Sequence, residues 1–190
     1  MPRTPRVQYP GALYHVSIQG NRDCSLYDDV DDREVFLSMT ARAVVQDGLI
    51  CHGYCEMTTH YHLFVQTPES NLDRGMHRLN SAYAHWFNKR HAHTGHLFKQ
   101  RYSASPIVDQ SHLLEVVRYV VLNPVRARMC RHPREWPWSS YAATAGLVEA
   151  PSFLDTRWTA ELFGGDVDEG RRRFVEFVDE GIPPVPGTGV

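Results

Sequence analysis

The chain has 190 residues, of which 42% are hydrophobic and 11% aromatic, and this composition predicts one globular domain and excludes a disordered chain. Its four cysteines favour a reduced, cytoplasmic interior, and its longest apolar stretch, residues 116–125, is interrupted by Arg118 and Asn123, so we expect no membrane span. The net charge of −2 conceals a split, because residues 71–134 carry eleven Lys and Arg against three acidic residues, whereas residues 151–190 carry four against eight.

Hydrophobic periodicity predicts short strands that alternate with amphipathic helices. In chain order, the sequence predicts a strand at 13–19, a helix at 31–46, strands at 49–55 and 61–67, a helix from Asn71 with its apolar stripe reaching Phe87, and a strand at 97–105. This order predicts an α+β fold, the ferredoxin-like split βαβ sandwich, with an antiparallel sheet and helices on one face.

A further helix is predicted from Asp109 or Ser111 to Leu122, ending near Asn123-Pro124 because proline lacks the N–H that continues a helix. Beyond it, two short helices are expected near 156–163 and 169–179, before a Pro- and Gly-rich tail from Ile182 that we expect to be loose. We therefore predict a domain over 1–145 and a C-terminal helical extension over 146–190.

Two histidines, His60 and His62, stand at the start of the third predicted strand. Residues two apart on a strand point to the same face, so the two imidazoles are placed to hold a divalent cation. Cys51 and Cys55 raise the alternative of a Cys/His zinc site, but on an extended strand they would lie roughly 13 Å apart, which favours two buried cysteines instead.

One stripe of the helix after Ser111 is polar and holds His112, Glu115, Tyr119 and Asn123 at steps of three, four and four residues. A tyrosine on such a helix is often a core residue, but a polar stripe must face water, a ligand or a metal. A phenol beside a cation can attack phosphorus and leave a phosphotyrosine. A cation held by the histidine pair would stabilise the developing charge, and such chemistry suits Mg²⁺ or Mn²⁺.

Several short motifs, in this order along roughly residues 1–145, resemble the REP-associated tyrosine transposases, which are relatives of the single-tyrosine insertion-sequence transposases. The motifs are Tyr14-His15-Val16, Gly20-Asn21-Arg22, Tyr54-Cys55-Glu56-Met57, His60-Tyr61-His62, Gly95-His96-Leu97-Phe98, the run 118–127, and Trp138-Ser139-Ser140-Tyr141. His60-Tyr61-His62 is similar to the His-hydrophobic-His (HUH) motif, with tyrosine in the middle place.

The resemblance implies an HUH endonuclease-like fold and a nuclease that nicks single-stranded DNA. It makes His60 and His62 metal ligands and Tyr119 the nucleophile. The polar residue four beyond the tyrosine, commonly Gln in the insertion-sequence branch, is the shorter Asn123 here, so Glu115 is the alternative third ligand. We expect a transposase that binds hairpin DNA, cleaves beside the hairpin and rejoins strands through a 5′-phosphotyrosine, using Mg²⁺ or Mn²⁺.

The basic middle of the chain is expected to bind the phosphates of this DNA. The candidates are Arg22, Arg78, Lys89, Arg90, Lys99, Arg101, Arg118, Arg126 and Arg128. A monomer is preferred over a homodimer, with a location at the nucleoid. The alternatives are a nucleic-acid-binding module of the same fold without catalysis, and a metal-dependent phosphoesterase for small substrates.

Overall fold

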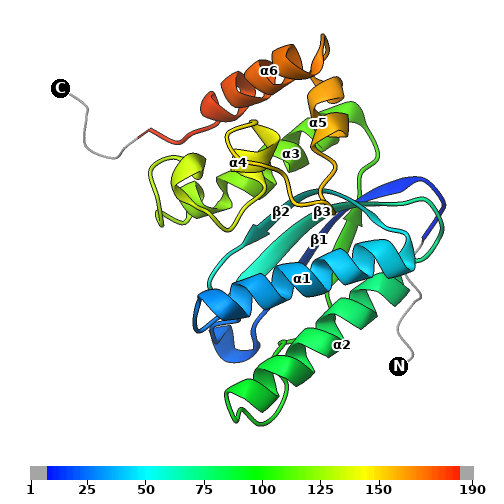
Figure 1. Cartoon of the computed structure of the whole chain (residues 1–190), viewed down its shortest axis with the longest axis vertical. Helices are drawn as coiled ribbons and strands as arrows, with labels where there is room; N and C mark the ends of the chain where they lie inside the picture. Colours follow the sequence, from blue (N-terminus) through cyan, green and yellow to red (C-terminus); the bar gives the residue numbers. More distant parts are fainter. Residues whose placement is uncertain (1–7, 185–190) are drawn as a thin grey trace.

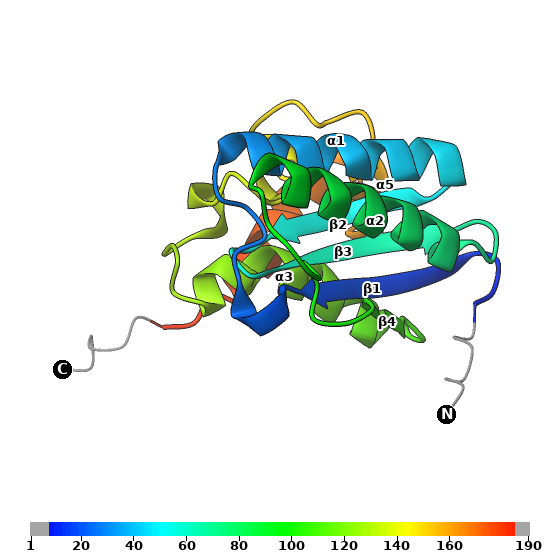
Figure 2. The same cartoon turned by 90° about the horizontal axis from the view of Figure 1, so that it is seen from below.

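The computed structural model describes residues 8–184, and its centre is a four-stranded sheet with the order β2-β3-β1-β4 (Figures 1 and 2). The strands are β1 (Ala12–Gln19), β2 (Ile50–Glu56), β3 (His60–Thr67) and β4 (Ser103–Pro106). Both β1 and β2 pair antiparallel with β3, which lies between them. Because α1 (Val30–Asp47) joins β1 to β2 and α2 (Leu72–Arg90) joins β3 to β4, the predicted split βαβ fold is confirmed.

The alternation of side chains along β1 and β3 directs one apolar set toward α1 and α2. This set comprises Tyr14, Val16, Ile18, Tyr61, Leu63 and Val65. α1 begins at a capping box, in which Asp29 and Asp32 each accept a hydrogen bond from the other's backbone N–H. It ends at Gly48, whose left-handed backbone (φ 64°) suits glycine.

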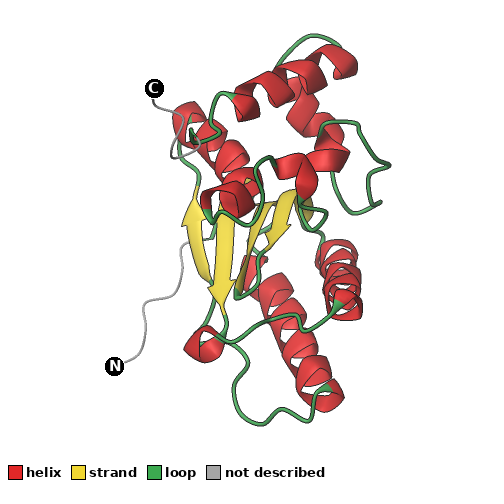
Figure 3. Ribbon diagram, turned by 90° about the vertical axis from the view of Figure 1, so that its left-hand side faces the viewer, coloured by secondary structure: helices red, strands yellow, loops and turns green. Residues whose placement is uncertain are grey.

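Helices cover both faces of the sheet, so the prediction of helices on one face was wrong. α3 (Gln110–Arg126) lies on the face opposite α1 and α2, and Figure 3 shows the sheet between the two helical layers. The reason is the wide apolar stripe of α3, whose Val117, Val120 and Val121 pack in a second core cluster with Phe64 of β3. A stripe of that width must be buried, and the second face of the sheet is where it is buried.

The chain beyond α3 packs on the same side of the sheet as α3. It forms a 3₁₀ turn (Pro133–Glu135), α4 (Tyr141–Thr144), α5 (Thr156–Leu162) and α6 (Val167–Asp179). Phe174 and Val178 of α6 are buried in the same cluster as the valines of α3. Of the tail expected to be loose, residues 185–190 lie outside the described residues. Among the helices of residues 8–184, none is long and apolar enough to cross a membrane.

Three boundaries differ from the predictions. β4 begins at Ser103 rather than at residue 97, because Tyr102 turns into the core and donates a hydrogen bond to Asp73 of α2. α3 continues through Pro124, since its last turns are buried on one side and this packing outweighs one lost hydrogen bond. Asn71 does not cap α2 with its side chain, which instead donates to the carbonyl of Asp47.

A buried ion pair joins α1 to the end of β2. Nη1 of Arg33 lies 3.5 Å from Oε2 of Glu56 and donates to the Glu56 carbonyl at 3.2 Å. The guanidinium also faces the rings of Tyr27, Trp136 and Trp138. Burial raises the pKa of Glu56 well above its usual range, and the adjacent guanidinium opposes that rise.

We predict that Arg33→Met lowers the free energy of unfolding by about 3–5 kcal/mol at neutral pH, because Glu56 would stay buried without its cation. Part of this loss should be recovered at lower pH. A carboxyl group whose pKa is raised in the folded state contributes stability that is complete below its unfolded pKa, about 4.3, and is lost as the pH rises through the folded pKa.

Urea unfolding at neutral pH and at about pH 5.5 measures both effects. The control is Arg33→Met/Glu56→Gln, which lacks the titrating group and should show no such recovery. An equal loss in the single variant at both pH values would contradict the assignment.

Candidate active site

The histidine pair lies on the face of β3 that α3 covers. The ring centroids of His60 and His62 are 5.0 Å apart. Tyr61 points to the opposite face, where its hydroxyl donates to Oδ1 of Asn80 at 2.6 Å. The alternation of the strand therefore separates the two imidazoles from the tyrosine between them.

Tyr119 extends from α3 over the same face of the sheet. Its ring centroid lies 5.4 Å from that of His62, with the two rings edge to face. The guanidinium carbon of Arg126 lies 5.2 Å from the centre of the Tyr119 ring. Two segments that the sequence singles out independently, one on a strand and one on a helix, are thus in contact.

The structure adds a third imidazole, His15 of β1, which the sequence analysis did not place in the site. Nε2 of His15 lies 2.9 Å from Nδ1 of His62, and the His15 ring centroid is also 5.4 Å from that of Tyr119. The signal was present in the sequence, because alternation of β1 turns His15 away from Tyr14 and Val16, which fill the core.

All three imidazoles are neutral near pH 7. Burial lowers the pKa of His62 to about 3, and the neighbouring His15 and His60 lower it further. Burial also lowers the pKa of His60 and of His15. A neutral imidazole is the form that binds a metal. His62 is 5% exposed, and its Nε2 atom is buried without any hydrogen-bond partner.

Neither predicted third ligand completes a compact metal group with the histidine pair. Glu115 is exposed and lines the cavity around Tyr119, while the side-chain amide of Asn123 donates to the Tyr119 carbonyl at 2.8 Å. Within residues 8–184, His60 and His62 belong to no group of three or more His, Cys, Asp or Glu whose ligand atoms all lie within 4.8 Å of one another. The histidine pair therefore offers two ligands.

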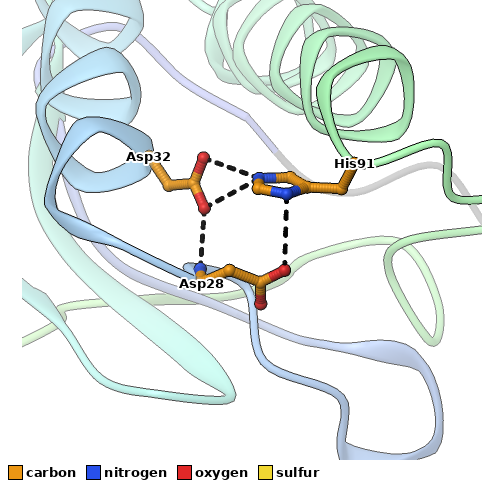
Figure 4. A group of neighbouring side chains, drawn as sticks. All are labelled: Asp28, Asp32 and His91. Carbon is orange, nitrogen blue, oxygen red and sulfur yellow. Dashed lines mark hydrogen bonds and ion pairs between the residues drawn. The ribbon is translucent and has the colours of Figure 1, made fainter.

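A group of three possible ligands does exist elsewhere in the described chain, at Asp28, Asp32 and His91 (Figure 4). Asp32 accepts hydrogen bonds from the backbone N–H groups of Asp28 and Asp29 and from the guanidinium of Arg90, and it contacts His91 at 2.9 Å. Its oxygens are already engaged, and a guanidinium occupies the position that a cation would need. This group is therefore a network of ion pairs that connects the start of α1 to the end of α2.

The alternative zinc site at Cys51 and Cys55 has no support in the structure. Both thiols are buried, and their Sγ atoms lie 3.6 Å from the carbonyl oxygen of Gly53 and 3.7 Å from the sulfur of Met57, respectively. Burial raises the pKa of Cys51 to about 12 and also raises that of Cys55. Within residues 8–184, neither cysteine belongs to a group of three or more possible metal ligands.

Four other tyrosines, Tyr61, Tyr83, Tyr102 and Tyr141, are buried in the core. Tyr61 donates to Asn80, Tyr83 donates to the carbonyl of Leu26, and Tyr102 donates to Asp73. Tyr141 is buried in the cluster beneath α3. Tyr119 differs from these four, since it is partly exposed and lines a cavity of about 360 Å³.

The cavity beside Tyr119, which we call the tyrosine cavity, brings together two arginines, two histidines, the tyrosine and one carboxylate. Its polar lining comprises His15, His112, Glu115, Arg118, Tyr119 and Arg126. Arg118 also packs on α6, because its guanidinium carbon lies 4.3 Å from the Phe177 ring centre. An anionic group such as a phosphate fits this mixture of guanidinium and imidazole groups.

The remaining basic candidates are all exposed residues, and three of them form ion pairs. Arg78 pairs with Asp47 at 2.7 Å, Arg90 pairs with the carboxylates at the start of α1, and Arg101 lies 3.7 Å from Asp73. The other four are Arg22, Lys89, Lys99 and Arg128. The structure thus leaves fewer cations for DNA than the sequence count suggests, since Arg78 and Arg90 hold helices together.

The fold defines a ferredoxin-like α+β protein in which a tyrosine faces a histidine pair. The family model of the IS200-like transposases matches residues 11–123, which is more than half of the chain. The chain therefore belongs to the IS200-like transposase family.

Two solved structures that resemble this chain come from related transposases by their descriptions. A REP-associated tyrosine transposase bound to a REP hairpin aligns with a TM-score of 0.67 and 15% identity, covering 88% of this chain and 93% of that chain. A Deinococcus radiodurans protein assigned as a candidate transposase aligns with a TM-score of 0.45 and 17% identity, covering 63% of this chain and 95% of that chain. No curated protein matches the sequence.

Proposed function

We propose that this transposase cleaves and rejoins single-stranded DNA beside a hairpin, with Tyr119 as the nucleophile. The observation that carries the proposal is the contact between Tyr119 and the imidazole cluster, with Arg126 over the phenol ring. The structural relative bound to a REP hairpin supports hairpin DNA as the substrate class. The nuclease function is assigned to residues 1–145, in a monomer at the nucleoid.

Strand cleavage by Tyr119 is a transesterification. Its phenolic oxygen forms a bond to phosphorus while the bond between phosphorus and the 3′-oxygen breaks. The 3′-oxygen leaves with a proton as a free hydroxyl group, and the 5′-phosphate stays on the tyrosine. Attack by a 3′-hydroxyl group on this phosphotyrosine reverses the step and rejoins a strand.

His60 and His62 are the residues that would hold a divalent cation. They fit this role because both are neutral, share one face, and include a buried Nε2 atom on His62 that has no hydrogen-bond partner. Mg²⁺ or Mn²⁺ bound there would polarise the phosphate and stabilise its developing charge. Glu115, Asn123 or a DNA oxygen would complete the ligand set.

We predict that Tyr119→Phe abolishes the covalent protein–DNA product and strand cleavage, because it removes the one attacking oxygen and almost no volume. Binding of hairpin DNA should stay within about twofold of the wild type, since a lost neutral hydrogen bond contributes little. Denaturing gels with a labelled hairpin measure the adduct, and anisotropy measures binding.

Tyr102→Phe is the control, because it removes the hydroxyl group of another tyrosine, one that donates a hydrogen bond to Asp73. A covalent band that survives in Tyr119→Phe and disappears in Tyr102→Phe would refute the assignment. Hairpin binding by the wild type with no cleavage in Mg²⁺ or Mn²⁺ would favour the non-catalytic binding module instead.

The metal role of the histidine pair predicts that His60→Ala loses cleavage in Mg²⁺ and Mn²⁺ and keeps hairpin binding. The expected loss is at least 100-fold, because a ligand is removed rather than a supporting group. His93→Ala is the matched control, since His93 is exposed and hydrogen-bonded to Asn88 away from the site. Full cleavage by His60→Ala would exclude the metal assignment.

A further inference from the structure

A second cavity lies away from Tyr119 and shares none of the lining of the tyrosine cavity. It has a volume of about 700 Å³, within the range of roughly 300–1,000 Å³ that is typical of ligand clefts. One wall is a polar stripe of α2, and the other is the segment Gly95–Tyr102. We call it the α2 groove.

The side chains of the α2 groove suit a nucleotide. His77, Ser81 and His85 recur along α2 at steps of four residues and are exposed, so they present donors and acceptors to the groove. Phe98 is half-buried in the facing wall, and Lys99 beside it is exposed. An aromatic ring for stacking, polar groups for base edges and a cation for phosphate are the components of a single-strand binding site.

The net positive charge of the α2 groove also favours binding of an anionic ligand such as a phosphate. Residues 74–108 contain no Asp or Glu, and the groove lining has one carboxylate, that of Asp73 at one end. That carboxylate already accepts hydrogen bonds from Tyr102 and Gln8. Lys99 and Arg101 face the groove from the opposite wall, so a phosphate entering it meets net positive charge.

The α2 groove begins next to the catalytic end of the sheet. Gln19 of β1 is paired with His60 of β3, and on its other side the Gln19 carbonyl accepts a hydrogen bond from Lys99 N at 3.0 Å. His60 and Lys99 are therefore separated by about two strand spacings, roughly 10 Å. A DNA strand that leaves the histidine pair can pass around the end of β1 into the groove.

We propose that the α2 groove binds the unpaired nucleotides that adjoin the scissile phosphate, with a base against Phe98 and a phosphate at Lys99. This inference rests on the proposed function and assigns that function a second DNA contact, on the opposite face of the sheet from Tyr119. The groove selects unpaired bases, since a base that is stacked within a duplex cannot also stack on the ring of Phe98.

Binding measured by anisotropy at several salt concentrations tests the proposal, with a hairpin that carries a single-stranded flank and the same hairpin with a blunt end. Lys99→Ala should reduce the log–log salt slope for the flanked hairpin by about 0.7, the value for one phosphate on single-stranded DNA. Phe98→Leu keeps an apolar core contact and should weaken binding of the flanked hairpin about tenfold. Neither variant should change binding of the blunt hairpin.

Arg42→Ala is the control, because Arg42 is an exposed cation on α1 outside the groove. The proposal is overturned if Lys99→Ala has the same slope as Arg42→Ala, or if both groove variants weaken blunt and flanked hairpins equally. Absence of cleavage by the wild type would refute the proposed function alone, because the groove is tested by binding.

A second inference comes from the contact between His15 and His62. One nitrogen in this contact must carry the hydrogen. If His15 were the donor, His62 would carry its own hydrogen on Nε2, which is buried without an acceptor. A buried N–H group without a partner is costly, so the favoured arrangement has His62 Nδ1 donating to His15 Nε2. The Nε2 lone pair of His62 would then be available to hold a metal.

We propose that His15 is a positioning residue that fixes the tautomer and orientation of His62. A metal-binding histidine commonly donates its other ring N–H to such a partner, usually a carboxylate, a carbonyl or water. Here the acceptor is a neutral imidazole. It leaves the site without an added negative charge next to the incoming phosphate.

Long-range ¹⁵N–¹H spectra of the metal-free protein, with labelled histidine, report which nitrogen of His62 is protonated. We expect the Nδ1–H tautomer in the wild type and in His15→Gln, whose amide oxygen can accept the same hydrogen bond. His15→Leu should shift His62 to Nε2–H and weaken Mn²⁺ binding about 10- to 100-fold. An Nε2–H tautomer in the wild type, or an unchanged tautomer in His15→Leu, would overturn the proposal.

Discussion

The antiparallel register between β1 and β3 is the constraint on which the site depends. Ser17 is opposite His62 and Gln19 is opposite His60, so His15 lies diagonally across from His62 on the same face. A slip of one residue would turn His15 into the core and Tyr14 into the site, because side chains alternate with a period of two. The buried Tyr14, Val16 and Ile18 resist such a slip, since all three would become exposed to the polar side. The apolar core on one face thus fixes the polar cluster on the other.

Sequence patterns predicted the order of elements, because this order follows from periodicity within single segments. The assignment of Tyr119 to the same site as the histidines came from the family resemblance. The sequence patterns failed where contacts between distant segments determine the position of a helix or the partner of a side chain. The placement of α3 on the second face depends on Phe64, which reads in the sequence as part of a continuous apolar run. Arg78 forms an ion pair with Asp47, 31 residues away along the chain, and Arg90 forms one with Asp32, 58 residues away. No local sequence pattern predicts such pairs.

Some motifs that carry the family resemblance are structural in this chain. Glu56 is the buried partner of Arg33, and Trp136 donates from its indole N–H to the Glu56 carbonyl. Ser140 donates its backbone N–H to the Tyr54 carbonyl, and its hydroxyl accepts from Tyr54 N at 3.1 Å. These contacts seal the outer edge of β2, which would otherwise be open to pairing with another chain. These residues therefore stabilise the fold and lie outside the proposed catalytic site.

The two faces of the sheet are coupled at the end of β1. On one side of β1, His60 is held by its pairing with Gln19, and on the other side of the strand the carbonyl of the same Gln19 accepts a hydrogen bond from the backbone N–H of Lys99. The next residue, Gly20, bridges Phe98 and has no room for a side chain, because a Cβ atom there would lie 2.4 Å from the carbonyl oxygen of Cys24. A shift of the segment that holds Phe98 and Lys99 therefore cannot be absorbed locally. It is transmitted through β1 to the strand that carries the histidine pair, so the proposed contacts of a flanking nucleotide and the proposed cleavage site depend on the same few backbone hydrogen bonds.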